Sequence, residues 1–130
     1  MREQGPHDRL LSFVGSDRGE IIASVRMTPI LAGTVAGHLL GPLAVRPSHK
    51  NLGIGRELVR IVLAAAEKSG SHAVLLVGDP PYYAPLGFQP TRPGALSMPG
   101  PFDKRRLLAA CYGETDAMAL EGEIRHRDRT

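Results

Sequence analysis

The chain has a single cysteine, Cys111, and no long apolar run. One cysteine excludes an internal disulfide and a cluster of thiolate ligands, so a reducing compartment is its natural place. No apolar run approaches the roughly 20 residues that a membrane-spanning helix needs, and residues 1–6 lack the apolar core of a signal peptide. We therefore expect a cytoplasmic protein with no membrane partner.

Basic and metal-binding residues are also too dispersed to form a recognisable site. The net charge is +3, and the single tight basic cluster is residues 104–106. Because no aromatic residues are interleaved with it, we expect a solvated surface and no nucleic-acid partner. The five histidines are scattered and form no ligand pair, so no metal site is expected.

The length of 130 residues fits one domain and leaves no room for a separate substrate domain, so residues 1–130 are expected to form a single domain. Residues 10–14 and 21–25 are short apolar runs separated by turn-forming residues, which predicts a hairpin. Further runs lead through Gly33 to residues 39–40 and then to residues 43–45 before Pro47. The first third is therefore predicted to be antiparallel strand.

The middle of the chain changes to helical spacing. Residues 53–68 predict one amphipathic helix that ends at Ser69 and Gly70. Its expected apolar face consists of Ile54, Leu58, Ile61, Val62 and Ala65. Residues 73–77 are an unbroken apolar run, as in a strand covered on both faces. A strand, a helix and a strand at this spacing predict a parallel crossover, so the fold class is α+β or mixed α/β.

The last third contains shorter elements. Residues 82–86 predict one helical turn that Gly87 ends, and four prolines favour a loop over residues 90–101. Two strand-like runs follow, at residues 107–112 and 123–126. No repeat and no second domain are visible.

The residues that favour a chemical function lie between the strand at 43–45 and the helix. Gly53 and Gly55 allow close approach of the backbone, and the first N–H groups of a helix carry partial positive charge. Lys50 and Arg56 flank this loop and add charge suited to a diphosphate. Taken alone, the pattern is equally compatible with a tight turn into a packed helix. The patterns of nucleoside-triphosphate and dinucleotide loops are both absent.

This segment resembles the GNAT family of acetyl-coenzyme A dependent N-acetyltransferases. Residues 50–55 read Lys-Asn-Leu-Gly-Ile-Gly, similar to the family's Gln/Arg-x-x-Gly-x-Gly/Ala, with Lys at the first position. Residues 43–47 look like the family's strand that ends in Val-x-Pro, and residues 82–88 are similar to aromatic-Tyr-x-x-x-Gly-Phe. Gly-Asp-Pro at 78–80 and Leu-x-x-Pro-Gly-Pro at 96–101 resemble a bacterial subgroup of the family. The resemblance is strongest over residues 40–88.

The resemblance implies a GNAT-like mixed sheet and an N-acetyltransferase that uses acetyl-CoA as cosubstrate without a metal. The acetyl group would pass to a primary amine by direct attack in a ternary complex. Backbone groups of Leu43 and Val45 would pair with the pantetheine arm, and N–H groups of residues 52–56 would hold the pyrophosphate. The implied cofactor-binding residues are Leu43, Ala44, Val45, Lys50, Asn51, Leu52, Gly53, Ile54, Gly55 and Arg56.

The same resemblance places Tyr83 near the sulfur as the proton donor, whereas Tyr82 is expected to pack the helical turn against the sheet. For the general base, His38 and Asp79 are both candidates without a motif behind them. His49 is expected to face solvent beside the loop. Cys111 is expected to fill core space.

Two further expectations follow from the resemblance. The family usually begins with a strand and two helices on the acceptor side, yet the first strand candidate here starts near Leu10. We expect a homodimer to close that side, the alternative being a monomer in which residues 1–9 and 90–101 fold over it. The alternative functions are a catalytically silent acyl-CoA binding or sensing protein and, less favoured, a nucleotide-binding module.

Overall fold

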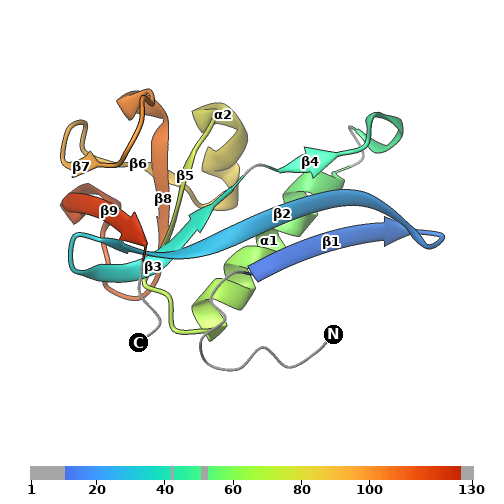
Figure 1. The fold of residues 1–130 in the computed structure, drawn as a ribbon, viewed down its shortest axis with the longest axis horizontal. Coiled ribbons are helices and arrows are strands. Elements are labelled where there is room, and N and C mark those ends of the chain that lie inside the picture. Colours follow the sequence, from blue (N-terminus) through green and yellow to red (C-terminus); the bar gives the residue numbers. More distant parts are fainter. Residues whose placement is uncertain (1–10, 42, 51–52, 127–130) are drawn as a thin grey trace.

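A computed structural model describes residues 11–41, 43–50 and 53–126 (Figure 1). The strands are β1 Leu11–Asp17, β2 Glu20–Ala32, β3 Val35–Leu40, β4 Ala44–Val45, β5 Ala73–Val77, β6 Gln89–Pro90, β7 Leu96–Ser97, β8 Leu107–Cys111 and β9 Gly122–His126. The helices are α1 Ile54–Lys68 and α2 Pro80–Tyr83, with 3-10 turns at Pro47–His49, Ala84–Leu86, Lys104–Arg106 and Ala117–Ala119. The strands pair in both directions in one mixed sheet, which confirms the predicted α+β class.

The predicted N-terminal hairpin is present, but its strands are longer than the apolar runs. Strands β1 and β2 pair antiparallel from Leu11 opposite Met27 to Asp17 opposite Glu20. Only Arg18 and Gly19 remain for the turn, with φ of 54° and 82°. Two residues with positive φ are typical of a hairpin turn whose twist matches the flanking strands. Residues 15–17, expected in the turn, therefore belong to β1.

Strand β2 continues without a break to Ala32 and organises the sheet from both of its edges. One edge pairs with β1 and then β9, and the other pairs with β3 and then β4. Figure 1 shows β2 running the width of the molecule. The short strands β4 and β9 are therefore held in the sheet through this one long strand.

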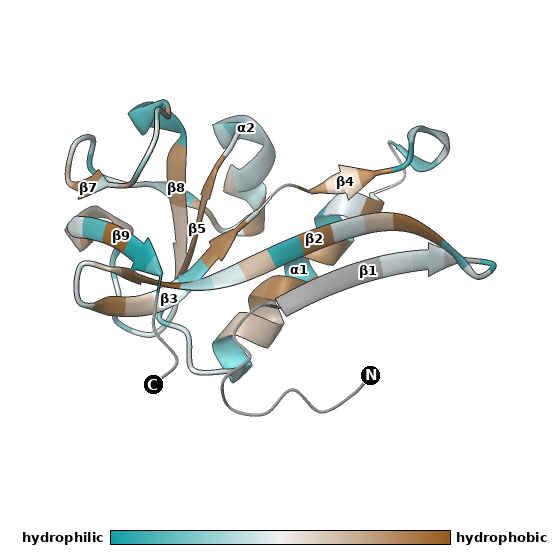
Figure 2. Ribbon diagram, in the orientation of Figure 1, coloured by the Kyte–Doolittle hydropathy of each residue, from teal (hydrophilic) through white to brown (hydrophobic). Residues whose placement is uncertain are grey.

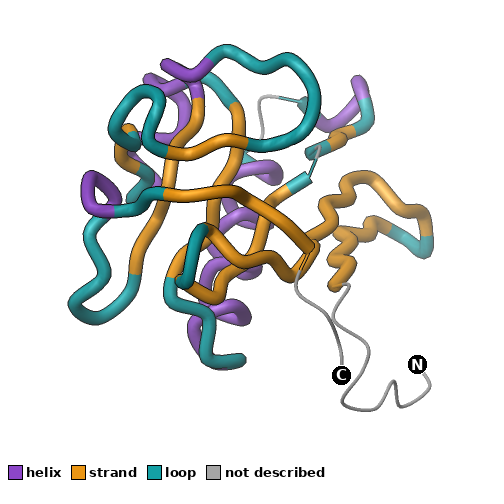
Figure 3. The backbone as a smooth tube through the Cα atoms, turned by 60° about the vertical axis from the view of Figure 1, so that its left-hand side comes forward, coloured by secondary structure: helices purple, strands orange, loops and turns teal. Residues whose placement is uncertain are grey.

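Helix α1 covers one face of the sheet, as Figure 3 shows, and its buried stripe differs from the predicted one. The fully buried residues are Gly55, Leu58, Val59, Val62 and Ala66. Ile61, expected in the core, is 47% exposed, whereas Val59 is completely buried. The helix is thus rotated about its axis relative to the expectation. Apolar residues on both flanks of the stripe had made the sequence pattern ambiguous.

The core has two parts, one on each face of the sheet. On the face under α1, Leu40, Leu76 and Phe88 pack with the helix. On the opposite face, Leu75, Leu96 and Leu107 pack with residues of the loops that follow β7 and β8. Strand β5 contributes alternate residues to both parts, and Figure 2 shows its apolar character. The strand has the predicted bounds of residues 73–77, and its first four residues are buried as expected, whereas Val77 is 41% exposed.

The predicted parallel crossover joins β3 to β5 through α1, and the two strands then separate. Their pairing is limited to His38 opposite Val74 and Leu39 opposite Leu75. Beyond this point, the chain shifts register against β2: Met27 faces Leu40 but Ser24 faces Ala44. Three steps along β2 thus correspond to four steps along its neighbour, and such an extra residue bends a strand. The β4 segment consequently leaves the side of β5.

The C-terminal third follows the prediction except within the proline-rich stretch. The helical turn is present as α2 and Ala84–Leu86, ended by Gly87 at φ 102°. Residues 90–101 are not entirely loop, because β6 pairs antiparallel with β8 and β7 pairs parallel with β9. Pro90 is tolerated because β6 is a terminal strand of the sheet order. Over the described residues, the helices are all too short or too polar to span a bilayer.

Candidate functional site

The first feature of the site is an unpaired edge of β4. In an antiparallel pair, residues alternate between those that bond the partner strand and those whose backbone groups point the other way. The Arg46 N–H donates to the Ile22 carbonyl at 2.7 Å. The alternation therefore turns backbone groups of Ala44 toward β2, and those of Leu43 and Val45 toward the opposite edge. Among the described strands, β4 pairs with β2 alone, so that edge has no strand partner.

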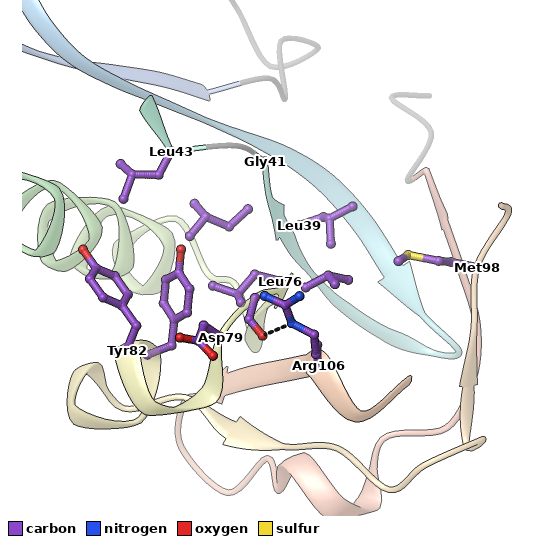
Figure 4. A pocket seen from close by; sticks show the side chains of 12 residues that line it. Leu39, Gly41, Leu43, Leu76, Asp79, Tyr82, Met98 and Arg106 are labelled. Atoms are coloured by element: carbon purple, nitrogen blue, oxygen red, sulfur yellow. Dashed lines mark hydrogen bonds between the residues drawn. The ribbon is translucent and has the colours of Figure 1, made fainter. Parts of the chain in front are cut away.

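A cavity of about 690 Å³, which we name the strand-gap cavity, lies where β4 and β5 have separated. Its lining residues are Leu39, Leu40, Gly41, Leu43, Leu76, Val77, Gly78, Asp79, Tyr82, Tyr83, Met98 and Arg106. Leu40 and Leu76 belong to the core part under α1, whereas Leu39 and Met98 pack with the part on the other face. The cavity thus connects the two faces of the sheet. In Figure 4, Tyr82 and Leu43 lie at one end and Met98 at the other.

A second cavity of about 660 Å³, the loop cavity, surrounds the start of α1. Its lining residues are Leu43, Ala44, Val45, His49, Lys50, Gly53, Ile54, Gly55, Arg56 and Tyr82. Eight of the ten cofactor-binding residues predicted from the sequence are in this set, and the other two, Asn51 and Leu52, lie outside the described residues. Leu43 and Tyr82 line both cavities, so the two are neighbouring parts of one cleft.

The loop cavity has the electrostatics of an anion site. The helix begins at Ile54, and its first N–H groups have no partner within the helix. Lys50 and Arg56 are exposed on the cavity wall, and the described lining residues include no carboxylate. Partial positive charge at a helix start and two cations together favour a phosphate group. His49, expected to face solvent, is half-buried in the same wall, where its Nδ1 lies 2.8 Å from Ser48 Oγ.

The two glycines of the loop are needed for different physical reasons. Gly53 caps the helix with φ of 80°, a left-handed conformation that disfavours other residues. Gly55 has ordinary helical geometry, but a Cβ there would lie 3.1 Å from both Leu43 Cδ2 and Tyr82 Oη. A larger residue at position 55 would therefore have to displace the side chains of Leu43 and Tyr82. The sequence interpretation had assigned both glycines to backbone approach toward a ligand.

Tyr83 lies in the strand-gap cavity and is held by aromatic contacts. Its ring meets Tyr82 edge-on at 4.8 Å between centroids and Phe88 at 5.6 Å. A Cβ at Gly78 would lie 2.6 Å from the Tyr83 ring, so the ring rests directly on the Gly78 backbone. Burial raises the pKa of the Tyr83 hydroxyl, and Tyr82 raises it further. The hydroxyl is therefore protonated at neutral pH and available as an acid.

Tyr82 lies between the two cavities and contacts the start of α1. Besides its approach to Gly55, its ring lies 5.3 Å from Arg56 Cζ, a cation–π distance. Tyr82 was expected to pack the helical turn against the sheet, and these contacts instead join the turn to α1 and place Tyr82 beside the cation of the loop cavity.

Of the two candidates for a general base, Asp79 lies at the strand-gap cavity and His38 does not. Asp79 lines the strand-gap cavity and precedes α2, where its backbone carbonyl accepts from the N–H groups of Tyr82 and Tyr83. His38 is 4% exposed within β3 and lines neither cavity. Cys111 packs against the core on the face away from α1, and burial followed by Asp116 raises the pKa of its thiol. That position agrees with a core-filling role.

Sequence reasoning missed Gly78, Met98 and Arg106 as lining residues. Arg106 reaches the site because β8 pairs with β5, with Val77 opposite Leu107, which places Arg106 beside Gly78. The Gly78 N–H donates to the Arg106 carbonyl at 2.9 Å. The pairing of the two apolar runs was the available signal, but their register cannot be read from the sequence. Within the described ranges, no three His, Cys, Asp or Glu residues gather as metal ligands.

Comparison with known sequences gives two findings. The acetyltransferase (GNAT) domain family matches residues 8–90. The uncharacterized N-acetyltransferase YjhQ of Escherichia coli (strain K12) is 32% identical over 95 residues, which are 70% of this chain and 52% of that protein. The matched part therefore spans about half the length of this curated relative.

Comparison with solved structures shows the same fold. The GNAT family N-acetyltransferase YhbS from Escherichia coli, solved in complex with CoA, superposes with a TM-score of 0.73 at 22% identity, covering 91% of this chain and 67% of that one. A GNAT family acetyltransferase from Brucella melitensis, solved in complex with acetyl-CoA, gives 0.68 at 23% identity, covering 91% and 66%.

Proposed function

Because the chain belongs to the GNAT family of acetyltransferases, we propose that it transfers an acetyl group from acetyl-CoA to a primary amine by direct attack in a ternary complex. One observation carries the proposal: the unpaired edge of β4 runs from the anion-favouring loop cavity to the cavity that contains Tyr83. The relatives that were solved with CoA and acetyl-CoA support the choice of donor.

The described residues fit an acyl-CoA in three places. The helix start with Lys50 and Arg56 suits the pyrophosphate, since N–H groups and cations converge there. The outward backbone groups of Leu43 and Val45 are suited to pair with the amides of the pantetheine arm, as an added strand would. The strand-gap cavity then leaves room for the thioester beside Tyr83.

The thioester supplies an activated carbonyl, and the protein has to orient it and move two protons. The amine nitrogen bonds to the carbonyl carbon as the carbon–sulfur bond breaks. Tyr83 Oη gives its proton to the departing thiolate, and the raised pKa keeps this hydroxyl in the acid form at neutral pH before the transfer. The surplus proton of the amine passes to water or to the Asp79 carboxylate in the same cavity.

The test compares two neighbouring tyrosines. Tyr83→Phe is expected to lower turnover by about 10² or more while acetyl-CoA affinity stays within a few fold, since a positioned acid acts mainly in the transition state. Tyr82→Phe is the matched control and should change turnover much less. The measurement is release of free CoA from acetyl-CoA over a panel of primary amines.

Each result has a distinct meaning. Equal losses in the two variants would remove the acid role from Tyr83. Binding of acetyl-CoA without turnover of any amine would instead support the alternative of a silent acyl-CoA binding protein. Absence of acetyl-CoA binding would contradict the proposal as a whole.

A further inference from the structure

One charged side chain of the strand-gap cavity has no role in the proposed handling of acetyl-CoA. Arg106 lines the cavity, and its Nε donates to the Gly78 carbonyl at 3.1 Å. Figure 4 shows this bond and the guanidinium beside Leu76. Among the described residues Arg106 makes no ion pair, so its terminal N–H groups are uncommitted in the cavity. The Gly78 bond restrains the Nε edge of the guanidinium.

The lining residues around Arg106 are mostly apolar, and Arg106 itself is exposed to solvent. Leu39, Leu76 and Met98 form an apolar wall, and Asp79 is the other charged residue among the described lining residues. Leu39 and Met98 belong to the face away from α1. The proposed donor path along β4 does not use Arg106, which leaves this part of the cavity for the acceptor.

We propose that the acceptor is an amine that also carries a carboxylate, which Arg106 binds while the amine reaches the thioester beside Tyr83. This inference rests on the proposed function and names its substrate class. A planar guanidinium matches the two oxygens of a carboxylate, and such charged hydrogen bonds are stronger than neutral ones. Asp79 suits the amine of the acceptor, because its charge attracts the ammonium form.

A carboxylate fits this cavity better than a phosphate. Arg106 supplies one positive charge, and Asp79 supplies a negative charge in the same cavity. A phosphate ester carries up to two negative charges near neutral pH, so Asp79 would repel it without a second cation to compensate. An acceptor with one carboxylate and one ammonium group matches the charges of Arg106 and Asp79.

The experiment uses matched acceptors, because Arg106 also supports the Gly78 backbone under Tyr83. The panel pairs amino acids with their primary amides, which are similar in size but lack the negative charge, and adds an aminoalkyl phosphate. We expect the wild-type protein to prefer the carboxylate member by about tenfold to a hundredfold in kcat/KM. Arg106→Gln should bring this ratio close to one. If Arg106→Gln instead damages the site through Gly78 and Tyr83, kcat/KM should fall equally for the acid and for the amide, and their ratio should stay unchanged.

Arg105→Ala is the control, because Arg105 pairs with Asp103 and does not line the cavity. Arg105→Ala should keep the wild-type ratio of acid to amide. Arg106→Lys keeps the positive charge without the paired N–H groups of the guanidinium, so it should give a ratio between those of the wild type and Arg106→Gln. Equal use of acid and amide by the wild type, an unchanged ratio in Arg106→Gln, or a preference for the aminoalkyl phosphate would each overturn the proposal.

A binding measurement separates this inference from the proposed function. Calorimetry on the CoA-saturated protein measures the affinity for each acid and its amide without any turnover. If the wild-type protein binds the acid more tightly than the amide and Arg106→Gln loses this difference, the inference is supported even if no acetyl transfer occurs. Turnover of amines with no such selectivity would support the proposed function and overturn the inference.

Discussion

Tyr112, at the end of β8, is the tyrosine that ties this strand to helix α1. Its hydroxyl donates to the Leu63 carbonyl at 2.6 Å, and its backbone N–H donates to the His72 carbonyl at 3.1 Å. Burial, with smaller contributions from Glu67 and Cys111, raises the pKa of Tyr112 to about 12. The folded state therefore favours the protonated hydroxyl more than the unfolded chain does.

The raised pKa predicts a stability change at alkaline pH. A folded pKa above the unfolded value gives stability that is present below about pH 10 and is lost as the pH rises toward about 12. Tyr112→Phe should lower the free energy of unfolding by about 1 kcal/mol at pH 8, the usual net value of one hydrogen bond. The difference between the two proteins should shrink by pH 11 in denaturant titrations. A difference that stays constant over this range would contradict the assignment.

At the residue scale, the sequence located the loop cavity better than the strand-gap cavity. The predicted residues of the loop cavity are close together along the chain, so one local pattern found them. Arg106 and Met98 approach Tyr83 only through strand pairing, and no local pattern carries that register. The packing reason for Gly55 could not be read from the sequence either, because Gly55 lies close to the side chain of Tyr82, which comes from a distant segment.

At the scale of elements, Gly37 controls how closely β3 approaches β5. A Cβ at Gly37 would overlap the Ala73 carbonyl oxygen, which is backbone and cannot rotate away. Gly37→Ala should therefore destabilise the fold by about 1–3 kcal/mol or more. Gly15→Ala is the matched control, since its Cβ would meet nothing closer than Ala23 Cβ at 3.8 Å. Thermal unfolding of both variants checks this, and equal effects would contradict a specific role for the contact.

Elements with a strong apolar pattern were predicted well, and elements defined by pairing were not. Helix α1 and strand β5 have clear spacing and ends, so their bounds agreed with the prediction. The full length of β2 was missed because polar residues interrupt its apolar runs. Strands β6 and β7 have two residues each and exist only through their partners β8 and β9. Local pattern cannot predict an element whose stability comes from its neighbour.

At the scale of the whole molecule, the sheet is continuous except where β4 and β5 separate. The strands β3 and β5 are parallel and paired on one side of this separation, while β4 remains with β2. The resemblance in the sequence implied the mixed sheet and the crossover, but the connection between its two faces follows from the extra residue before Ala44. The expected homodimer stays a prediction.

The last prediction concerns the stability of the whole protein when a donor binds. Acetyl-CoA at about 100 times its Kd should add about 2.7 kcal/mol to the free energy of unfolding and raise Tm by roughly 5–15 °C. Arg56→Ala removes a cation from the loop cavity and should weaken binding about tenfold, which reduces the shift by about half. Arg60→Ala is the matched control, because Arg60 lies on the same helix, pairs with Glu57 and does not line the cavity.

Arg56→Ala is a sharper test of this site than a change of the neighbouring glycine, such as Gly55→Glu. The glutamate would also disturb the contacts of α1 with Leu43 and Tyr82, so a loss of binding there would have two explanations. Each Tm shift is measured against the same variant without ligand, which separates affinity from intrinsic stability. Of these two arginines, Arg56 lines the loop cavity and Arg60 does not. Equal Tm shifts in the two variants would therefore contradict a pyrophosphate at the start of α1.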